Sequence, residues 1–187
     1  MTAMKQTVRI IGGLYRGKKL PFPAIDGLRP TPDRIRETLF NWLMQDIRDA
    51  HCLDAFAGSG ALGLEAFSRG AAHVTFLEKN SEAYAHLLKV LKTFDSLKLR
   101  IKKEDACDFF TQSKDSFNII FLDPPFASHL LPRCLDSLFH SHVLIKGGLI
   151  YVESPHAIEV DSTKWQQVKL KKAGQVFYGL YKKIASA

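Results

Sequence analysis

Long apolar runs, paired cysteines and metal-binding patterns are absent from this 187-residue sequence. No apolar run approaches the ~18 residues that a membrane-spanning helix needs, and the first residues lack the apolar region of a secretory signal. We therefore expect a cytoplasmic protein. The cysteines Cys52, Cys107 and Cys134 are odd in number and far apart, which predicts reduced thiols in or near the core. The histidines form no HExxH pattern, and His140 and His142 are only a pair in a predicted loop, so we expect no metal site.

Acidic side chains are scarce in the first 40 residues, which carry eight Lys or Arg against three Asp or Glu. The rest of the chain is nearly balanced, so much of the net charge of +7 lies near the N-terminus. Such a local excess favours a polyanionic partner, with nucleic acid first. Solubility is the alternative explanation, because excess charge also keeps a protein in solution.

The segment 123–126, Asp-Pro-Pro-Phe, follows an apolar run at 117–122 that is typical of a buried strand. Both prolines stiffen the turn, since each fixes its own φ and moves the preceding residue out of helical geometry. The turn therefore presents the Asp123 carboxylate and a carbonyl oxygen beside the Phe126 ring. The exocyclic amine of a nucleobase offers two N–H donors and a π-face, so it suits this turn. A plain loop with Phe126 packed on the core is the alternative.

From residue 51 onward, predicted strands and helices alternate, which is typical of a doubly wound α/β sheet. We therefore expect a Rossmann-like α/β fold built on a seven-stranded, mostly parallel sheet. The predicted strands are 51–55, 73–78, 98–103, 117–122, 148–153, 166–171 and 176–184, and the predicted helices are 61–70, 81–94 and 130–140.

Residues 8–20 resemble two short strands that are joined through Gly12 and Gly13, which predicts a β-hairpin. Basic side chains would decorate this hairpin, where they could contact the phosphates of a nucleic acid. We divide the chain into a basic hairpin extension, 1–28, and a Rossmann-like domain, 29–187.

A helix is predicted over 32–48, with Thr31 as its N-cap and Pro32 at its first position. Arg34 and Arg36 lie in or near the first turn of this helix, where positive charge opposes the helix dipole. Because this arrangement has a small electrostatic cost, we expect an anion to bind there.

A glycine-rich loop, 54–63, joins the first strand of the predicted sheet to its helix. Gly58 and Gly60 allow a tight turn and close backbone approach, and Gly63 lets the helix pack closely on the strand. Glu78 ends the next strand, where a carboxylate can bind ribose hydroxyls. By itself this loop suits NAD as well as S-adenosylmethionine.

Carboxylates at the ends of successive strands favour S-adenosylmethionine. Asp54 would repel a pyrophosphate but can bind the ammonium group of the methionine part. Asp105 ends the third strand, where an adenine amine could bind, and Asp123 ends the fourth, beside the crevice where ligands bind in open α/β sheets. Together with Glu78, these residues predict a class I methyltransferase. A NAD-dependent oxidoreductase is disfavoured by Asp54 and by the lack of a recognisable hydride-transfer pocket.

Four segments of the sequence, 9–20, 29–43, 54–71 and 123–126, together resemble the RsmD-type family, and the match covers nearly the whole chain. These are bacterial methyltransferases of small-subunit ribosomal RNA that act on guanine N2, conventionally guanine 966 of 16S rRNA. The 123–126 motif alone is shared with DNA adenine-N6 enzymes, whereas 9–20 and 29–43 are more specific. A DNA adenine-N6 methyltransferase remains an alternative, although it normally needs a sizeable target-recognition region. A non-catalytic ribosome-assembly binder is the other alternative.

The resemblance agrees with the site residues read from the sequence. It implies S-adenosylmethionine as cofactor and 16S rRNA, within a small-subunit particle, as partner, and we expect a monomer. Expected catalytic residues are Asp123, Pro124, Pro125 and Phe126. Expected cofactor-binding residues are Asp54, Ala55, Phe56, Gly58, Ser59, Gly60, Gly63, Glu78, Lys79, Asn80, Asp105 and Ala106. Expected RNA-binding residues are Arg9, Tyr15, Arg16, Lys18, Lys19, Arg34 and Arg36. For Tyr15, packing within the hairpin is the alternative.

Overall fold

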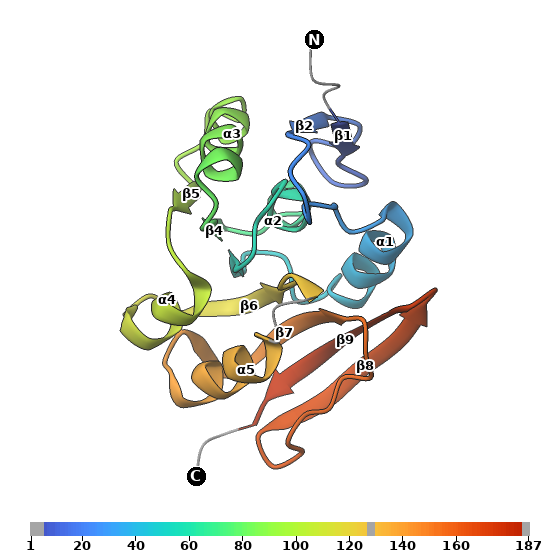
Figure 1. The fold of residues 1–187 in the computed structure, drawn as a ribbon, viewed down its shortest axis with the longest axis vertical. Helices are drawn as coiled ribbons and strands as arrows, with labels where there is room; N and C mark the ends of the chain where they lie inside the picture. Colours follow the sequence, from blue (N-terminus) through green and yellow to red (C-terminus); the bar gives the residue numbers. More distant parts are fainter. Residues whose placement is uncertain (1–5, 127–129, 185–187) are drawn as a thin grey trace.

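The computed structural model describes residues 6–126 and 130–184, which form a seven-stranded sheet covered by helices and a separate two-stranded sheet (Figure 1). The strands are β1 Gln6–Arg9, β2 Lys19–Phe22, β3 His51–Asp54, β4 His73–Leu77, β5 Leu99–Lys102, β6 Phe117–Leu122, β7 Leu144–Ser154, β8 Trp165–Ala173 and β9 Val176–Lys183. The helices are α1 Asp33–Trp42, α2 Ala61–Ser68, α3 Ser81–Lys92, α4 Ala106–Gln112 and α5 Leu131–His140.

The large sheet has the strand order β5-β4-β3-β6-β7-β9-β8. Strands β3 to β7 are parallel, whereas β9 is antiparallel to both of its neighbours, β7 and β8. The predicted α/β fold with a mostly parallel seven-stranded sheet is therefore confirmed. The strand order reverses between β3 and β6, so a ligand crevice is expected at the carboxyl ends of these two strands.

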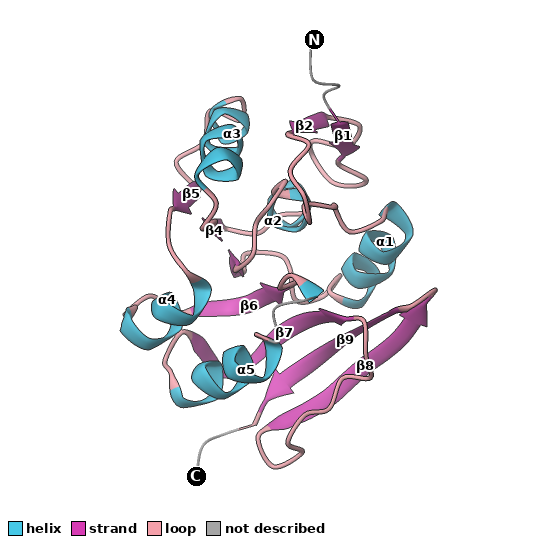
Figure 2. Ribbon diagram, viewed as in Figure 1, coloured by secondary structure: helices cyan, strands magenta, loops and turns pink. Residues whose placement is uncertain are grey.

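Helices cover the sheet on two sides (Figure 2). The sheet separates two apolar clusters, one on each face. Helices α1, α2 and α3 contribute to one cluster, and α4 and α5 contribute to the other. Strand β6 contributes side chains to both clusters. Ile119 and Phe121 pack in the first cluster, and Ile120 and Leu122 pack in the second. Burial on both faces explains why this strand is a continuous apolar run.

Helix α1 differs from its prediction at both ends. It ends at Trp42, and residues 43–48 form turns, so the predicted range 32–48 is too long. Its N-cap is Pro32, and the prediction of Thr31 as N-cap is wrong, because the Thr31 hydroxyl donates to Glu153 Oε1 at 2.7 Å. Helix α4 was not predicted at all. Among the described residues, no helix is long and apolar enough to cross a membrane.

The predicted hairpin is present as β1 and β2, with Arg9 opposite Lys19. Its turn is bound to α2, because the N–H groups of Ile11 and Gly12 donate to the two carboxylate oxygens of Glu65, each at 2.8 Å. The inward side chains of both strands are buried in the same apolar cluster as α1 to α3. Glu65 thus ties the hairpin to the helical layer.

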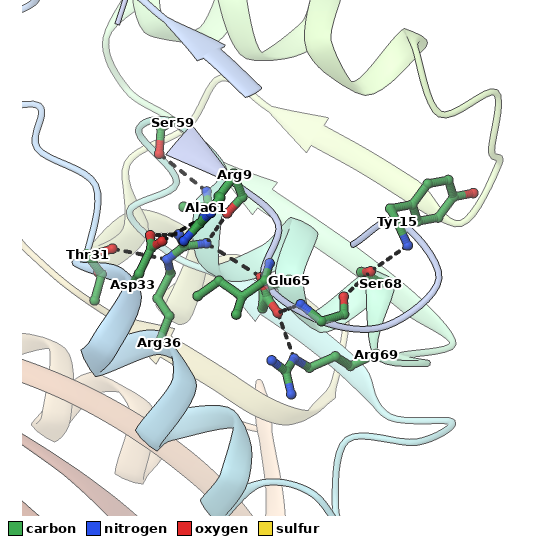
Figure 3. Close-up of polar contacts among 12 residues, drawn as sticks. Arg9, Tyr15, Thr31, Asp33, Arg36, Ser59, Ala61, Glu65, Ser68 and Arg69 are labelled. Carbon is green, nitrogen blue, oxygen red and sulfur yellow. Dashed lines mark hydrogen bonds and ion pairs between the residues drawn. The ribbon is translucent and has the colours of Figure 1, made fainter. Parts of the chain in front are cut away.

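Arg36 completes this network and is fully buried (Figure 3). Its Nη2 lies 2.6 Å from Asp33 Oδ1, and its Nη1 lies 3.5 Å from Glu65 Oε2. It also donates to the carbonyl oxygens of Thr31 and Arg9. At Arg36, the anions are therefore carboxylates of the chain itself. The prediction that Arg36 binds RNA is wrong, because none of its side chain reaches the surface.

Candidate functional site

Four carboxylates lie at the carboxyl edge of the central parallel strands. Asp54 is the last residue of β3, Glu78 directly follows β4, and Asp123 directly follows β6. Glu153 is the last residue but one of β7. Asp123 and Glu153 each follow the residue pair that ends the β6–β7 ladder, so they lie next to each other across two neighbouring strands. This edge therefore holds an unusual density of acid groups.

The glycine loop between β3 and α2 has the backbone that its sequence predicts. Gly58 and Gly60 have φ values of +51° and +77°, in the left-handed region that favours glycine. A Cβ at Gly63 would collide with the Phe76 ring on β4, so α2 can pack this closely only with glycine there.

Asp54 is buried beneath this loop, with 2% of its surface exposed. Its Oδ2 accepts a hydrogen bond of 2.9 Å from the Gly63 N–H, in the first turn of α2. Burial raises the pKa of Asp54 to about 7, and the negative charge of Glu78 adds to this effect, while the Gly63 N–H opposes it. A buried carboxyl group with such a pKa is poised to pair with a cation.

Glu78 supports the loop from the neighbouring strand. Its Oε2 accepts from the Gly58 N–H at 2.9 Å and its Oε1 accepts from the Asn80 N–H at 2.7 Å. Asn80 has a helix-capping role that the sequence interpretation missed, because its side chain accepts from two N–H groups in the first turn of α3.

Asp105 follows β5, at the same edge of the sheet. Since β4 lies between β5 and β3, Glu78 is between Asp105 and the glycine loop. Asp105 Oδ1 accepts from the Cys107 N–H at the start of α4, and its Oδ2 lies 3.1 Å from Lys79 Nζ. Partial burial raises the pKa of Asp105, but the hydrogen bonds from Lys79 and the Cys107 N–H outweigh it and hold that pKa below its usual range. Ala106, next in the chain, is buried.

These groups fit S-adenosylmethionine. Asp54 matches the ammonium group of its methionine part, and Glu78 lies where ribose hydroxyls bind in this fold. A dinucleotide fits poorly, because its pyrophosphate would approach a buried carboxylate at the start of α2. Among the predicted residues nearby, Ala55 and Ser59 are buried, whereas Phe56 is partly exposed.

Asp123 lies close enough to Asp54 and Glu153 to feel both charges, and it directly precedes Pro124. Its pKa is well above the usual range of a carboxyl group, because burial raises it first and the charges of Glu153 and Asp54 raise it further. The Thr31 hydroxyl acts in the opposite direction. Pro124 is buried behind Asp123, and the Phe126 ring is 45% exposed. The ring is therefore free to take a flat partner, and the alternative of a ring packed into the core is wrong.

Glu153 is a site residue that the sequence interpretation missed. It is 4% exposed, and its Oε1 accepts from the Thr31 hydroxyl at 2.7 Å and from the Tyr151 hydroxyl at 2.8 Å. Burial raises the pKa of Glu153, and both hydroxyls lower it. A signal was available, since the predicted strand 148–153 ends on this acid, just as the predicted strand 73–78 ends on Glu78, while Asp54 and Asp123 lie within one residue of the ends of theirs.

A cavity of about 360 Å³ opens beside the Asp123 turn, between the start of α5 and the segment that follows β7. This volume is within the range of small-molecule sites. Its lining is mostly apolar and includes Pro124, Phe126, Leu131, Leu135, Glu153 and His156. The cavity therefore brings together an exposed ring, the predicted proline turn and the carboxylate of Glu153.

The predicted RNA-binding residues of the hairpin lie away from this cavity. The Leu14 N–H donates to Ser68 O at the end of α2, and Lys18 Nζ donates to Thr93 O just beyond α3. Both helices begin near the carboxyl edge and return to the amino edge, because they connect parallel strands. The hairpin turn is therefore at the amino edge of the sheet, on the side opposite Asp123.

The side chains of these predicted residues differ in their surroundings. Tyr15 stacks on Phe67, with ring centres 5.6 Å apart, and meets Phe94 edge-on, which favours the packed alternative. Arg9 pairs with Asp33 at 3.0 Å. Arg16, Lys19 and Arg34 are exposed.

Comparison with known proteins identifies relatives that match most of the length of this chain. Residues 8–182 match the family described as conserved hypothetical protein 95. The chain is 47% identical over 180 residues to ribosomal RNA small subunit methyltransferase D of Escherichia coli. The match covers 95% of this chain and 91% of that protein.

Solved structures resemble the fold as well. The Escherichia coli protein yhhF superposes with a TM-score of 0.89 at 46% identity, and the match covers 97% of this chain and 100% of that one. The Thermus thermophilus 16S rRNA N2 G1207 methyltransferase superposes with a TM-score of 0.70 over 97% of this chain and 50% of its own. At 20% identity, this second likeness concerns the fold alone.

Proposed function

This chain belongs to the family described as conserved hypothetical protein 95, the RsmD-type family, and on that premise we propose how it acts on its substrate. It is a methyltransferase of small-subunit ribosomal RNA that uses S-adenosylmethionine. The proposed target is the exocyclic N2 amine of one guanine in 16S rRNA, guanine 966 by family resemblance. The observation that carries this proposal is the position of Asp123 between the buried Asp54 and a cavity of about 360 Å³.

The cofactor, when bound, supplies an electrophilic methyl group on a sulfonium sulfur. On the protein side, Asp54 would hold the ammonium group, and Glu78 would take the ribose hydroxyls while it keeps the turn at Gly58 in place. Lys79 and Asp105 would border the adenine. Since the acids are fixed by backbone N–H groups before the cofactor arrives, little ordering is needed on binding.

Asp123 and the Pro124 carbonyl would accept the two N–H bonds of the guanine amine. This arrangement favours a pyramidal nitrogen whose lone pair is directed at the methyl group, and positioning of this kind supplies much of the rate. As the nitrogen–carbon bond formed and the sulfur–methyl bond broke, with its electron pair left on sulfur, the amine proton would become acidic and pass to Asp123. A carboxylate whose pKa is raised by burial accepts this proton more readily than an ordinary one.

Phe126 would stack on the guanine after it has turned out of its RNA context into the cavity. Its exposed ring supports this role, and such a contact is worth ~1–3 kcal/mol. The RNA beyond the target base would meet exposed basic side chains. We keep Arg9, Arg16, Lys18, Lys19 and Arg34 as proposed contacts, within a hairpin extension at 1–28 that precedes a catalytic domain at 29–187.

The partner proposed for this surface is 16S rRNA within a small-subunit particle, met by a monomer in the cytoplasm. The decisive experiment incubates the protein with labelled S-adenosylmethionine and 16S rRNA transcribed in vitro, both naked and assembled into small subunits. Nucleoside analysis should detect N2-methylguanosine, and mapping should place it at one guanine. Label in N6-methyladenosine, or tight RNA binding without any transfer, would replace the proposal by one of its alternatives.

A further inference from the structure

The C-terminal strands β8 and β9 form a long antiparallel ribbon at one edge of the sheet (Figure 1). The sequence of this ribbon is basic. After Asp161 the sequence contains six lysines and no acidic residue. The segment between residues 41 and 161 carries more acidic than basic side chains, so the positive charge of the chain gathers at its two ends. From the sequence, only the N-terminal part of this charge was predicted to contact nucleic acid.

Strand register places the tip of this ribbon at the catalytic edge. Tyr178 on β9 pairs with Glu153 on one side and with Lys171 on the other. In the next register position, Phe177 pairs with Ser154 and with Lys172. Neighbouring strands lie ~4.8 Å apart, so both lysines are about 10 Å across the sheet from two residues that line the cavity.

The two lysines lie on opposite faces of the ribbon. Lys171 Nζ is 6.0 Å from the centre of the Trp42 ring, which stacks on Tyr178, so this lysine is on the α1 face. Lys172 Nζ is 4.7 Å from the centre of the Phe177 ring, which packs on the cluster of α4 and α5. Both side chains are exposed, and the stacked rings hold the ribbon against α1.

From this placement we propose that the tip of the β8–β9 ribbon, with Lys171 and Lys172, is an RNA-contacting surface that binds phosphates flanking the target nucleotide. The inference rests on the proposed function, and it names the surface that receives the RNA beside the cavity. A base that occupies the cavity brings its neighbouring phosphates within reach of groups about 10 Å away, since lysine side chains are long and flexible. The hairpin turn, at the opposite edge of the sheet, has no such proximity to the cavity.

Lysines on a free strand edge also discourage pairing with other chains. This simpler role predicts a change in association and no change in RNA recognition. The two roles are therefore separated by measuring RNA kinetics and oligomeric state on the same variant.

The test compares the full chain with Lys171→Gln/Lys172→Gln and with a matched control, Lys89→Gln/Lys92→Gln, which removes the same charge from exposed positions on α3. Methyl transfer to in-vitro-transcribed 16S rRNA, naked and in small subunits, is measured over a range of salt concentrations. The ribbon variant should raise KM for RNA about tenfold at low salt. Its salt slope should be shallower by about 1.5, as expected for two lost phosphate contacts.

Cofactor affinity of both variants should equal that of the parent protein, which also reports correct folding. A charge-keeping variant, Lys171→Arg/Lys172→Arg, should retain the parent KM. The inference is overturned if the ribbon variant matches the α3 control in KM and salt slope, or if it only forms oligomers. If the parent protein transfers no methyl group, the proposed function is wrong, but the ribbon can still be tested. RNA binding by the parent, the ribbon variant and the α3 control is then compared by fluorescence anisotropy.

Discussion

The Thr31 hydroxyl donates to Glu153 Oε1 at 2.7 Å, across a sequence separation of 122 residues. Both side chains are buried, at 5% and 4% exposure. The bond joins the segment before α1 to the end of β7, beside the cavity in which we propose the target base to bind. The N-terminal part of the chain thus takes part in building the catalytic edge, in addition to any contact with RNA.

Replacing Asp123 tests the proposed proton acceptor. Asp123→Asn keeps the shape of the side chain but removes its charge, so kcat should fall by about 10²- to 10⁴-fold. Affinity for S-adenosylmethionine, measured by calorimetry, should stay within about threefold of the parent value, because Asp54 and Glu78 are untouched. Near-parent turnover would exclude Asp123 from the chemical step.

Removing the Glu153 charge should change the pH dependence of methyl transfer. The charge of Glu153 helps to raise the pKa of Asp123, so Glu153→Gln should lower that pKa. If transfer requires ionised Asp123, the acidic limb of the kcat–pH profile will move to lower pH in the variant. An acidic limb that stays in place would show that the two carboxyl groups do not titrate together in the working enzyme.

Thr31→Val should have the opposite effect on the profile and a separate effect on stability. The Thr31 hydroxyl lowers the pKa of Asp123, so its loss should move the acidic limb to higher pH. Chemical denaturation should show a loss of about 1–3 kcal/mol, since a buried carboxylate loses one of its donors. Thr38→Val serves as control, because the Thr38 hydroxyl only bonds within α1, to Arg34 O. Equal losses in the two variants would contradict the role given to Thr31.

Affinity for S-adenosylmethionine should rise with pH through the pKa of Asp54, which is about 7. The ammonium group pairs with the ionised carboxylate, and below that pKa only a fraction of the protein carries one. Apparent affinity therefore falls about tenfold for each pH unit below 7. Calorimetry between pH 5.5 and pH 8 measures this dependence.

The Asp54→Asn variant is the control for that titration. It should bind the cofactor weakly and with little pH dependence over the same range. The stability of the cofactor-free parent should change with pH in the opposite direction to its cofactor affinity. The pKa of Asp54 in the folded state lies above the ordinary 3.8, so the folded state holds an extra proton between pH 4 and 7. The free energy of unfolding therefore falls as pH rises through this window. A flat affinity profile for the parent would contradict the pairing of Asp54 with the ammonium group.

Arg36→Leu tests the buried network that replaced the predicted RNA contact. It leaves Glu65 without one of its cationic partners in the interior, so the free energy of unfolding should drop by about 3–5 kcal/mol. Arg34→Leu, two residues earlier and exposed, should change stability by less than about 0.5 kcal/mol. Urea denaturation of both variants makes the comparison, and similar values for the two would contradict the burial of Arg36.

Local pattern was enough to predict most of the fold. The apolar run 117–122 became β6, the glycine loop has its left-handed turns at Gly58 and Gly60, and the sheet is seven-stranded and mostly parallel. These features depend on residues near one another in the chain. Thr31 was misread for the same reason, since a hydroxyl before a helix start favours an N-cap unless a distant partner competes for it.

The sequence by itself determined the alternation of strands and helices and the acids that end the parallel strands. Only the tertiary structure decided which charged groups are buried together and which reach solvent. Arg36 faces Glu65 because α1 packs beside α2, and Glu153 meets Thr31 because β7 ends where α1 begins. Register between β7, β9 and β8 likewise brought Lys171 and Lys172 level with the cavity. Burial, register and helix packing join residues that are far apart in sequence, and a one-dimensional pattern does not contain those distances.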